Sequence, residues 1–172
     1  MTTADPEGAA REALARYLPI IDETAVRPFP PVDLDDGAGH GGPDHLVRVL
    51  RRSQDFWDDE YHAALHRAEE EMGAELDALA AALTVRWGDP LVVDLWSYLI
   101  ADDDGKGTPE PIGYLCQNAT EMRVWPLPGG GRWIGLTVGQ HDTELPLELL
   151  AAVGRTPLPA PGAEGPGVPT VR

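Results

Sequence analysis

Cysteine and lysine are almost missing from this chain of 172 residues, which has one of each, Cys116 and Lys106. A single cysteine excludes an internal disulfide, and its position within an apolar run favours burial as a small hydrophobic side chain. No window approaches the roughly 18 uninterrupted apolar residues of a membrane-spanning helix. The N-terminus has neither the basic start nor the apolar stretch of a secretory signal. We therefore expect a cytoplasmic protein without membrane attachment.

Basic residues are scarce as well. Thirteen lysines and arginines face 29 aspartates and glutamates, which gives a formal net charge of −16. This charge opposes approach to the phosphates of nucleic acids and to anionic membrane surfaces. It favours a basic or arginine-rich protein partner, although the same excess also keeps a protein soluble without any partner.

The first 43 residues predict two peripheral segments. A proline directly after Asp5 indicates the start of a short helix within residues 1–23, which Pro19 should end because its ring cannot continue the hydrogen-bond ladder. Residues 24–43 contain four prolines and four glycines, too many for a helix or a central strand. They predict a linker or arm that is either pinned to the core by Phe29 or mobile.

The folded domain is expected over residues 44–155, followed by a disordered Pro/Gly-rich tail over residues 156–172. From residue 44 to about 83 the pattern is helical, with a break near Ser53 and a long helix over about residues 54–85. Its apolar side chains recur at steps of three and four, which predicts one buried face. They are Tyr61, Leu65, Ala68, Met72, Leu76, Leu79 and Leu83.

Four short apolar runs follow, over residues 91–101, 111–117, 121–127 and 132–140, with turn-forming clusters between them. They predict an antiparallel meander. The glycines at 129–131 supply the positive φ angles of a hairpin turn. Residues 142–154 predict a closing helix that ends at Gly154. The expected fold class is therefore α+β: a four-stranded antiparallel meander on one long amphipathic helix, with a short N-terminal and a closing C-terminal helix.

Two clusters of titratable residues are candidates for chemistry. His62 and His66 lie four residues apart on the predicted long helix, a spacing that suits metal ligands, but the zincin glutamate is absent and a solvated surface pair is the simpler interpretation. His141, Asp142 and Glu144 lie where the last strand meets the closing helix. There they either cap the helix or line an acid/base site. We expect no cofactor and no metal.

Four tryptophans, at positions 87, 96, 125 and 133, fall in or beside the predicted sheet. One long helix covers only one face, so some of these indoles should be exposed unless the arm or the closing helix covers them. Two-residue alternation places Trp133 opposite Ile134, in a groove shaped by the small Gly135 and Gly139. Tryptophan and arginine dominate binding hot spots. The predicted partner-binding residues are Trp133, Trp125, Arg123 and Arg132.

The sequence thus predicts an acidic, non-enzymatic interaction module that binds a basic protein partner. Its size, charge and layout are those of small bacterial immunity-type inhibitors and secretion chaperones, which is an analogy of layout only. The alternative is a small-molecule-binding or hydrolytic enzyme with a pocket near His141, Asp142 and Glu144. A subunit of a homo-oligomer is the third possibility.

Overall fold

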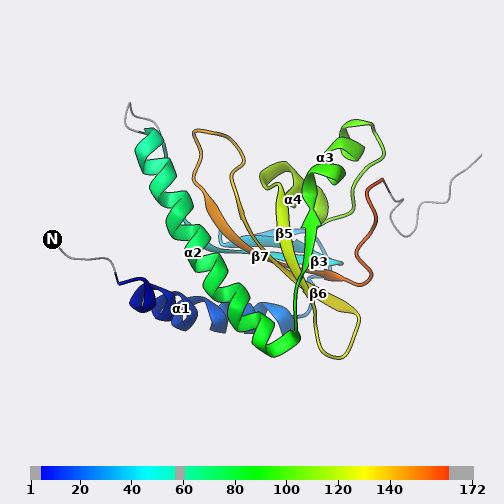
Figure 1. Cartoon of the computed structure of the whole chain (residues 1–172). Helices are drawn as coiled ribbons and strands as arrows, with labels where there is room; N and C mark the ends of the chain where they lie inside the picture. The colour runs from blue at the N-terminus through cyan, green and yellow to red at the C-terminus, as the bar shows by residue number, and fades with distance from the viewer. Residues whose placement is uncertain (1–4, 57–60, 163–172) are drawn as a thin grey trace, which may run out of the picture.

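The computed structural model describes residues 5–56 and 61–162. Within them lie four helices and one seven-stranded antiparallel sheet (Figure 1). The helices are α1 (Pro6–Val26), α2 (Tyr61–Trp87), α3 (Leu95–Asp103) and α4 (Ile112–Asn118). The strands are β1 (Leu34–Asp35), β2 (Gly39–Gly42), β3 (His45–Arg52), β4 (Leu91–Asp94), β5 (Glu121–Pro126), β6 (Arg132–Gly139) and β7 (Glu148–Arg155). No described helix is long and apolar enough to cross a membrane.

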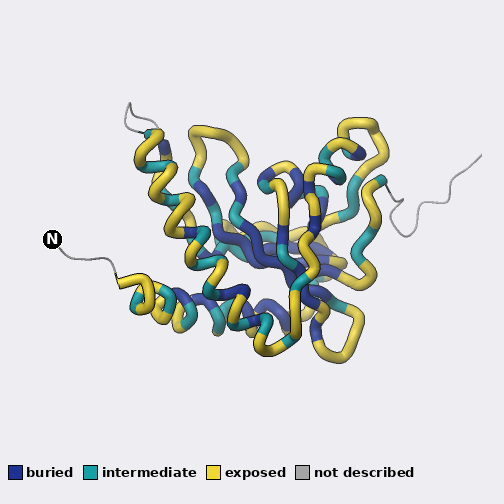
Figure 2. Tube along the Cα trace, in the orientation of Figure 1, coloured by how far each residue is buried: buried dark blue, intermediate teal, exposed yellow. Residues whose placement is uncertain are grey.

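The sheet lies between two helical layers. Its strand order is β1-β2-β3-β7-β6-β5-β4. Helices α1 and α2 pack on one face, and α3 and α4 pack on the other. Buried residues are concentrated in the strands between these layers (Figure 2). The α+β class and the antiparallel sheet are confirmed, whereas the four-stranded meander with only one covered face is wrong.

The closing helix predicted over residues 142–154 is also wrong, because this segment contains β7. Strand β7 is the middle of the seven strands, between β3 and β6. Both of its faces are buried: Leu149, Ala151 and Val153 belong to one core cluster, and Leu150 and Ala152 belong to the other. A strand buried on both faces has a continuous apolar run in place of alternation, and periodicity alone cannot distinguish such a run from a helix.

Two predicted strands are helical for a related reason. The run over residues 91–101 is a strand only as far as Asp94 and then becomes α3, and the run over residues 111–117 forms α4. The Asp94 carboxylate accepts hydrogen bonds from Trp96 N at 3.0 Å and Ser97 Oγ at 2.7 Å. This N-cap starts the helix directly at the end of the strand.

The segments before α2 also differ from the expectation. The predicted helical region from residue 44 begins instead with β3, which buries Leu46 and Leu50 toward α1 and α2 and Val47 toward the opposite layer. The supposed linker over residues 24–43 supplies β1 and β2. Their glycines suit an edge, where the outer strand has few partners.

Helix α1 begins at Pro6 as predicted but runs through Pro19 to Val26. A proline within a helix removes one hydrogen bond, and burial of Ile21 and Ala25 in the core offsets that loss. Helix α2 is confirmed, with Met72, Leu79 and Leu83 fully buried. Residues 57–60, which belong to the predicted long helix, lie outside the described residues.

The hairpin of β5 and β6 is confirmed, with positive φ angles of 93°, 70° and 88° at the three glycines 129–131. The tail predicted to be disordered is partly packed. Leu158 contacts the core cluster between the sheet and helices α3 and α4, and the Tyr98 hydroxyl donates a hydrogen bond to the Pro159 carbonyl. Residues 163–172 of that predicted tail lie outside the described residues.

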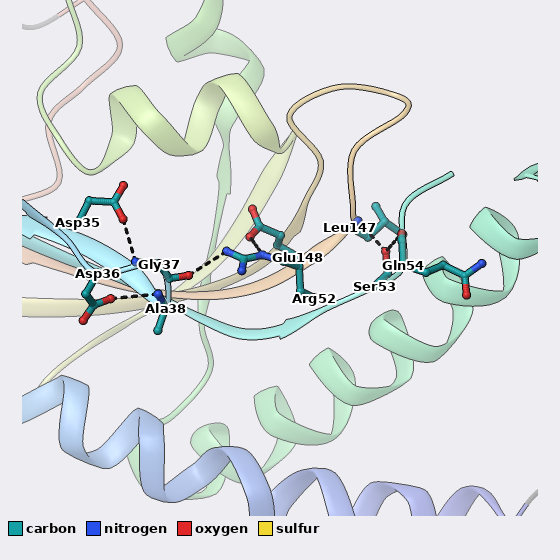
Figure 3. Close-up of polar contacts among 9 residues, drawn as sticks. All are labelled: Asp35, Asp36, Gly37, Ala38, Arg52, Ser53, Gln54, Leu147 and Glu148. Atoms are coloured by element: carbon teal, nitrogen blue, oxygen red, sulfur yellow. Dashed lines mark hydrogen bonds and ion pairs between the residues drawn. The ribbon is translucent and has the colours of Figure 1, made fainter. Parts of the chain in front are cut away.

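Side-chain hydrogen bonds hold the β1–β2 turn against the rest of the sheet (Figure 3). Asp35 and Asp36 accept hydrogen bonds from the backbone N–H groups of Gly37 and Ala38, each at 3.0 Å. Arg52, at the end of β3, donates to the Gly37 carbonyl at 3.2 Å and to the Glu148 carboxylate at 2.8 Å. The short outer strands are therefore tied to both β3 and β7.

Candidate protein-binding edge

Strand β4 forms one edge of the sheet, with β5 as its only strand neighbour among the described residues. Leu91 is paired with Val124 and Asp94 with Glu121. Just beyond the strand, the Leu95 N–H donates to the Thr120 carbonyl at 2.8 Å. Hydrogen-bonded positions alternate along an antiparallel pair, so positions 91, 93 and 95 bond to β5. Val92 therefore directs its N–H and C=O toward the open edge.

Four large apolar side chains are exposed at this edge. Leu91 and Val92 of β4 are 60% and 59% exposed, and Trp96 and Ile100 of α3 are 56% and 46% exposed. The two helical residues are four positions apart and share one side of α3. We call these four residues the β4 edge surface. An edge strand with apolar side chains and unpaired backbone groups is a template for another strand.

The segment that carries this surface is strongly acidic. Residues 88–105 contain five aspartates and no lysine or arginine. None of the five is in an ion pair within the described part of the chain. Asp94 also lies directly opposite Glu121 on β5, and like charges at facing positions destabilise a strand pair. A cationic group at this edge would relieve that repulsion.

The expected exposure of Trp125 and Trp133 is wrong, because both indoles are buried. Trp125 packs in the cluster beneath α1 and α2 and donates from Nε1 to the Gly88 carbonyl at 3.0 Å. Trp133 is on the opposite face, as the alternation predicted, but it is only 2% exposed and donates to the Arg155 carbonyl at 3.1 Å. The indole itself occupies the predicted groove beside Gly135, and Asn118 occupies the space beside Gly139.

The two predicted partner-binding arginines have contacts within the fold. Arg123 donates to the Asp77 carboxylate on α2 at 2.8 Å. Arg132 donates to the Arg27 carbonyl at 2.7 Å, and its Cζ lies 3.8 Å from the centre of the Phe29 ring. Burial, together with the neighbouring Arg155, lowers the pKa of Arg132. Of the two possibilities for the arm, packing by Phe29 is the one found.

The alternative acid/base residues do not surround a pocket formed with a closing helix. His141, Asp142 and Glu144 are all exposed, in a loop before β7. Asp142 accepts hydrogen bonds from the Thr143 N–H and hydroxyl, at 2.6 and 3.3 Å, within this loop. The helix that was expected to form one wall of the pocket is replaced by a solvent-exposed turn and a strand.

His62 and His66 lie on the exposed side of α2. His66 Nε2 is 3.2 Å from the Glu70 carboxylate, and both side chains are about 70% exposed. The His62 ring lies against Tyr61, with 3.8 Å between ring centroids. This is the geometry of a solvated surface pair.

Sequence reasoning missed the β4 edge surface because it placed Trp96 in the middle of a strand. The available signal was the capping sequence at Asp94, followed by apolar residues four positions apart and an aspartate run.

Comparison of the chain with protein-family models, with curated proteins and with solved structures gives no match.

Proposed function

We propose that this protein is a non-enzymatic binding module, of the immunity-type inhibitor or chaperone-like kind, that takes a basic segment of a partner protein as an added strand beside β4. The observation that carries the proposal is the β4 edge surface. There, within the described part of the chain, backbone groups without a strand partner, exposed apolar side chains and aspartates without ion pairs occur together. Addition of a peptide strand to a sheet edge is a recurring mode of protein recognition.

The backbone and the apolar side chains supply affinity. A strand beside β4 would pair with the outward N–H and C=O of Val92. Its side chains alternate between the two faces, as Leu91 and Val92 do, so one set would contact Leu91 on the α3 side and the other Val92 on the α2 side. Trp96 and Ile100 would contribute further apolar contact area, and aromatic residues of this kind dominate binding energy.

Charge determines which partner is favoured. Residues 88–105 carry five aspartates, of which Asp89 and Asp94 flank β4. Their charge attracts a basic segment, and this attraction weakens as salt screens it. A second copy of this chain would bring another Asp89 and Asp94 to the same edge. Self-association through β4 is therefore disfavoured relative to binding of a basic partner.

A synthetic peptide can stand in for the basic segment of the partner. A peptide of about ten residues that alternates arginine with valine has the strand period and the required charge. Two matched peptides serve as controls: one carries aspartate in place of arginine, and one keeps the arginines but carries proline in place of alternate valines. Binding is followed by backbone NMR shifts, by hydrogen exchange of the Val92 and Asp94 amides, and by the NMR signal of the Trp96 indole N–H.

We expect the Arg/Val peptide to bind, to shift residues 91–96 and to protect the Val92 amide, with affinity that falls as salt rises. Val92→Pro removes the outward N–H and should weaken binding roughly tenfold or more. Val32→Pro is the matched control, because it makes the same substitution at a residue that is equally exposed, at 61%, beside the opposite edge of the sheet. Equal binding of the proline peptide, or protection of amides elsewhere, would refute strand addition at β4.

A further inference from the structure

Two histidines and a glutamate come together at the edge opposite β4. One nitrogen each of His40 and His45 and one carboxylate oxygen of Glu110 lie within 4.8 Å of one another. His45 is only 6% exposed, His40 is half-buried and Glu110 is exposed. The cluster therefore has a buried side and a side that is open to solvent.

The pairing of β2 and β3 explains why the two imidazoles meet. Gly42 is paired directly with His45, and residues that face each other across a strand pair point to the same side of the sheet. His40 is two residues from Gly42 on β2, so its side chain also points to that side. This is the side of α4, where the His40 ring packs edge-on against Tyr114 at 4.3 Å between centroids.

Glu110 reaches the histidines from the connection before α4. One of its carboxylate oxygens, Oε2, accepts a hydrogen bond from the Tyr114 N–H at 3.2 Å. A Cβ atom at Gly113 would lie 2.9 Å from the other oxygen, so the missing side chain leaves room for the carboxylate. The Tyr114 N–H therefore orients the carboxylate, and one of its oxygens lies within 4.8 Å of an imidazole nitrogen of each histidine.

Space and negative charge are also present at the cluster. A cleft of about 390 Å³ is lined by His40, His45, Glu110, Tyr114, Asp33 and Asp35 among others. A Cβ atom at Gly42 would lie 2.5 Å from the Asp33 carboxylate and 2.9 Å from the His45 ring. Glycine at this position therefore lets a second carboxylate approach the buried imidazole.

We propose that His40, His45 and Glu110 bind a divalent transition-metal ion of the Zn²⁺ class. Two imidazole nitrogens and one carboxylate oxygen are a ligand set typical of zinc, with a fourth position left for water or another donor. Bonds of about 2.0–2.2 Å place the ligand atoms of a tetrahedral ion roughly 3.3–3.5 Å apart. His40 and Glu110 are the two more exposed members, so they are the side chains free to move toward these separations.

Such an ion would join the β2–β3 hairpin to the connection before α4. These segments are far apart in the sequence, so the three ligands come together only in the folded chain. Binding would therefore stabilise the folded state by an amount that grows with the logarithm of the ligand excess over Kd. The site is at the opposite edge of the sheet from β4 and does not depend on strand addition there. The two proposals therefore stand or fall separately.

The test uses the full-length, tag-free protein after removal of metal by a chelator. Zn²⁺ is titrated by calorimetry, with Mg²⁺ as a hard-cation comparison, and the melting temperature is measured with and without Zn²⁺. The variants are His40→Ala and Glu110→Gln, whose side chains are not fully buried. The control is the double variant His62→Ala/His66→Ala, which removes the exposed histidine pair on α2.

We expect one Zn²⁺ per chain with micromolar or tighter affinity, weak or no Mg²⁺ binding, and a melting temperature that rises with Zn²⁺. His40→Ala should weaken Zn²⁺ binding roughly tenfold or more and abolish the rise, as loss of a ligand does, and Glu110→Gln should also weaken it. The control should behave as the parent protein. The proposal is overturned if the parent does not bind Zn²⁺, if His40→Ala binds it equally well, or if the control loses binding.

Discussion

The contact between Trp133 and Gly154 gives the sharpest test of the core. These residues lie directly opposite each other on β6 and β7. A Cβ atom at Gly154 would lie 2.4, 2.6 and 2.8 Å from the Cζ2, Cε2 and Nε1 atoms of the indole. Gly154→Ala therefore forces either the indole or the strand to move.

The magnitudes follow from packing. Gly154→Ala should destabilise the protein by roughly 1–3 kcal/mol, the usual cost of overpacking a core. Trp133→Ala should cost roughly 3–5 kcal/mol, because it leaves a large cavity and removes the hydrogen bond to the Arg155 carbonyl. In the Trp133→Ala background the alanine meets no indole, so Gly154→Ala should be neutral or stabilising by about 0.5–1 kcal/mol. The two changes should then be coupled by about 2 kcal/mol.

Urea denaturation of the parent, the two single variants and the double variant measures this coupling. Fluorescence and far-ultraviolet circular dichroism should give coincident transitions if unfolding is two-state. Gly73→Ala is the control, because Gly73 lies within α2 with no atom within 4 Å of its missing Cβ. There the same substitution should stabilise the protein by about 0.5–1 kcal/mol through helix propensity alone.

Additive effects at Trp133 and Gly154 would refute the assigned packing. A near-neutral Trp133→Ala would also do so, and it would restore the exposed indole that the sequence suggested. A Gly154→Ala variant as stable as the parent would show that a methyl group fits between Gly154 and the Trp133 indole, and so would contradict the packing described above.

Two other residues give independent predictions. Arg51→Gln leaves Glu71 and the mostly buried Glu75 as an unpaired like-charge pair on α2. It should therefore destabilise the protein by about 1–2 kcal/mol in low salt and by less in high salt. Urea denaturation in both salt conditions would measure this difference. Burial, assisted by Asp102, raises the pKa of the Cys116 thiol, so alkylation of the native protein should be slower than that of the urea-unfolded chain. Because the pKa is raised in the folded state, the neutral thiol contributes stability below the pKa of an unfolded cysteine. That stability is lost as pH rises from the unfolded pKa through the folded pKa. The melting temperature of Cys116→Ala should not show this loss.

Local patterns were sufficient for some elements. The three- and four-residue recurrence of apolar side chains predicted α2, since a helix with one buried face has that period. Three consecutive glycines between two β-rich runs predicted the β5–β6 hairpin, because few other residues adopt its positive φ angles. The alternation along β6 placed Trp133 and Ile134 on opposite faces, as the two core clusters confirm.

Tertiary pairing decided the rest. Strand β7 is apolar throughout because neighbours cover both of its faces, and no window within residues 142–155 contains those neighbours. Burial of Ile21 and Ala25 carries α1 past Pro19, against the local preference. The exposed β4 edge arises because β4 comes last in the strand order of the described residues, with β5 on one side of it. His40 and His45 meet through the register of the β2–β3 hairpin. Glu110 joins them only through the packing of α4, because no local pattern relates it to a hairpin so distant in sequence.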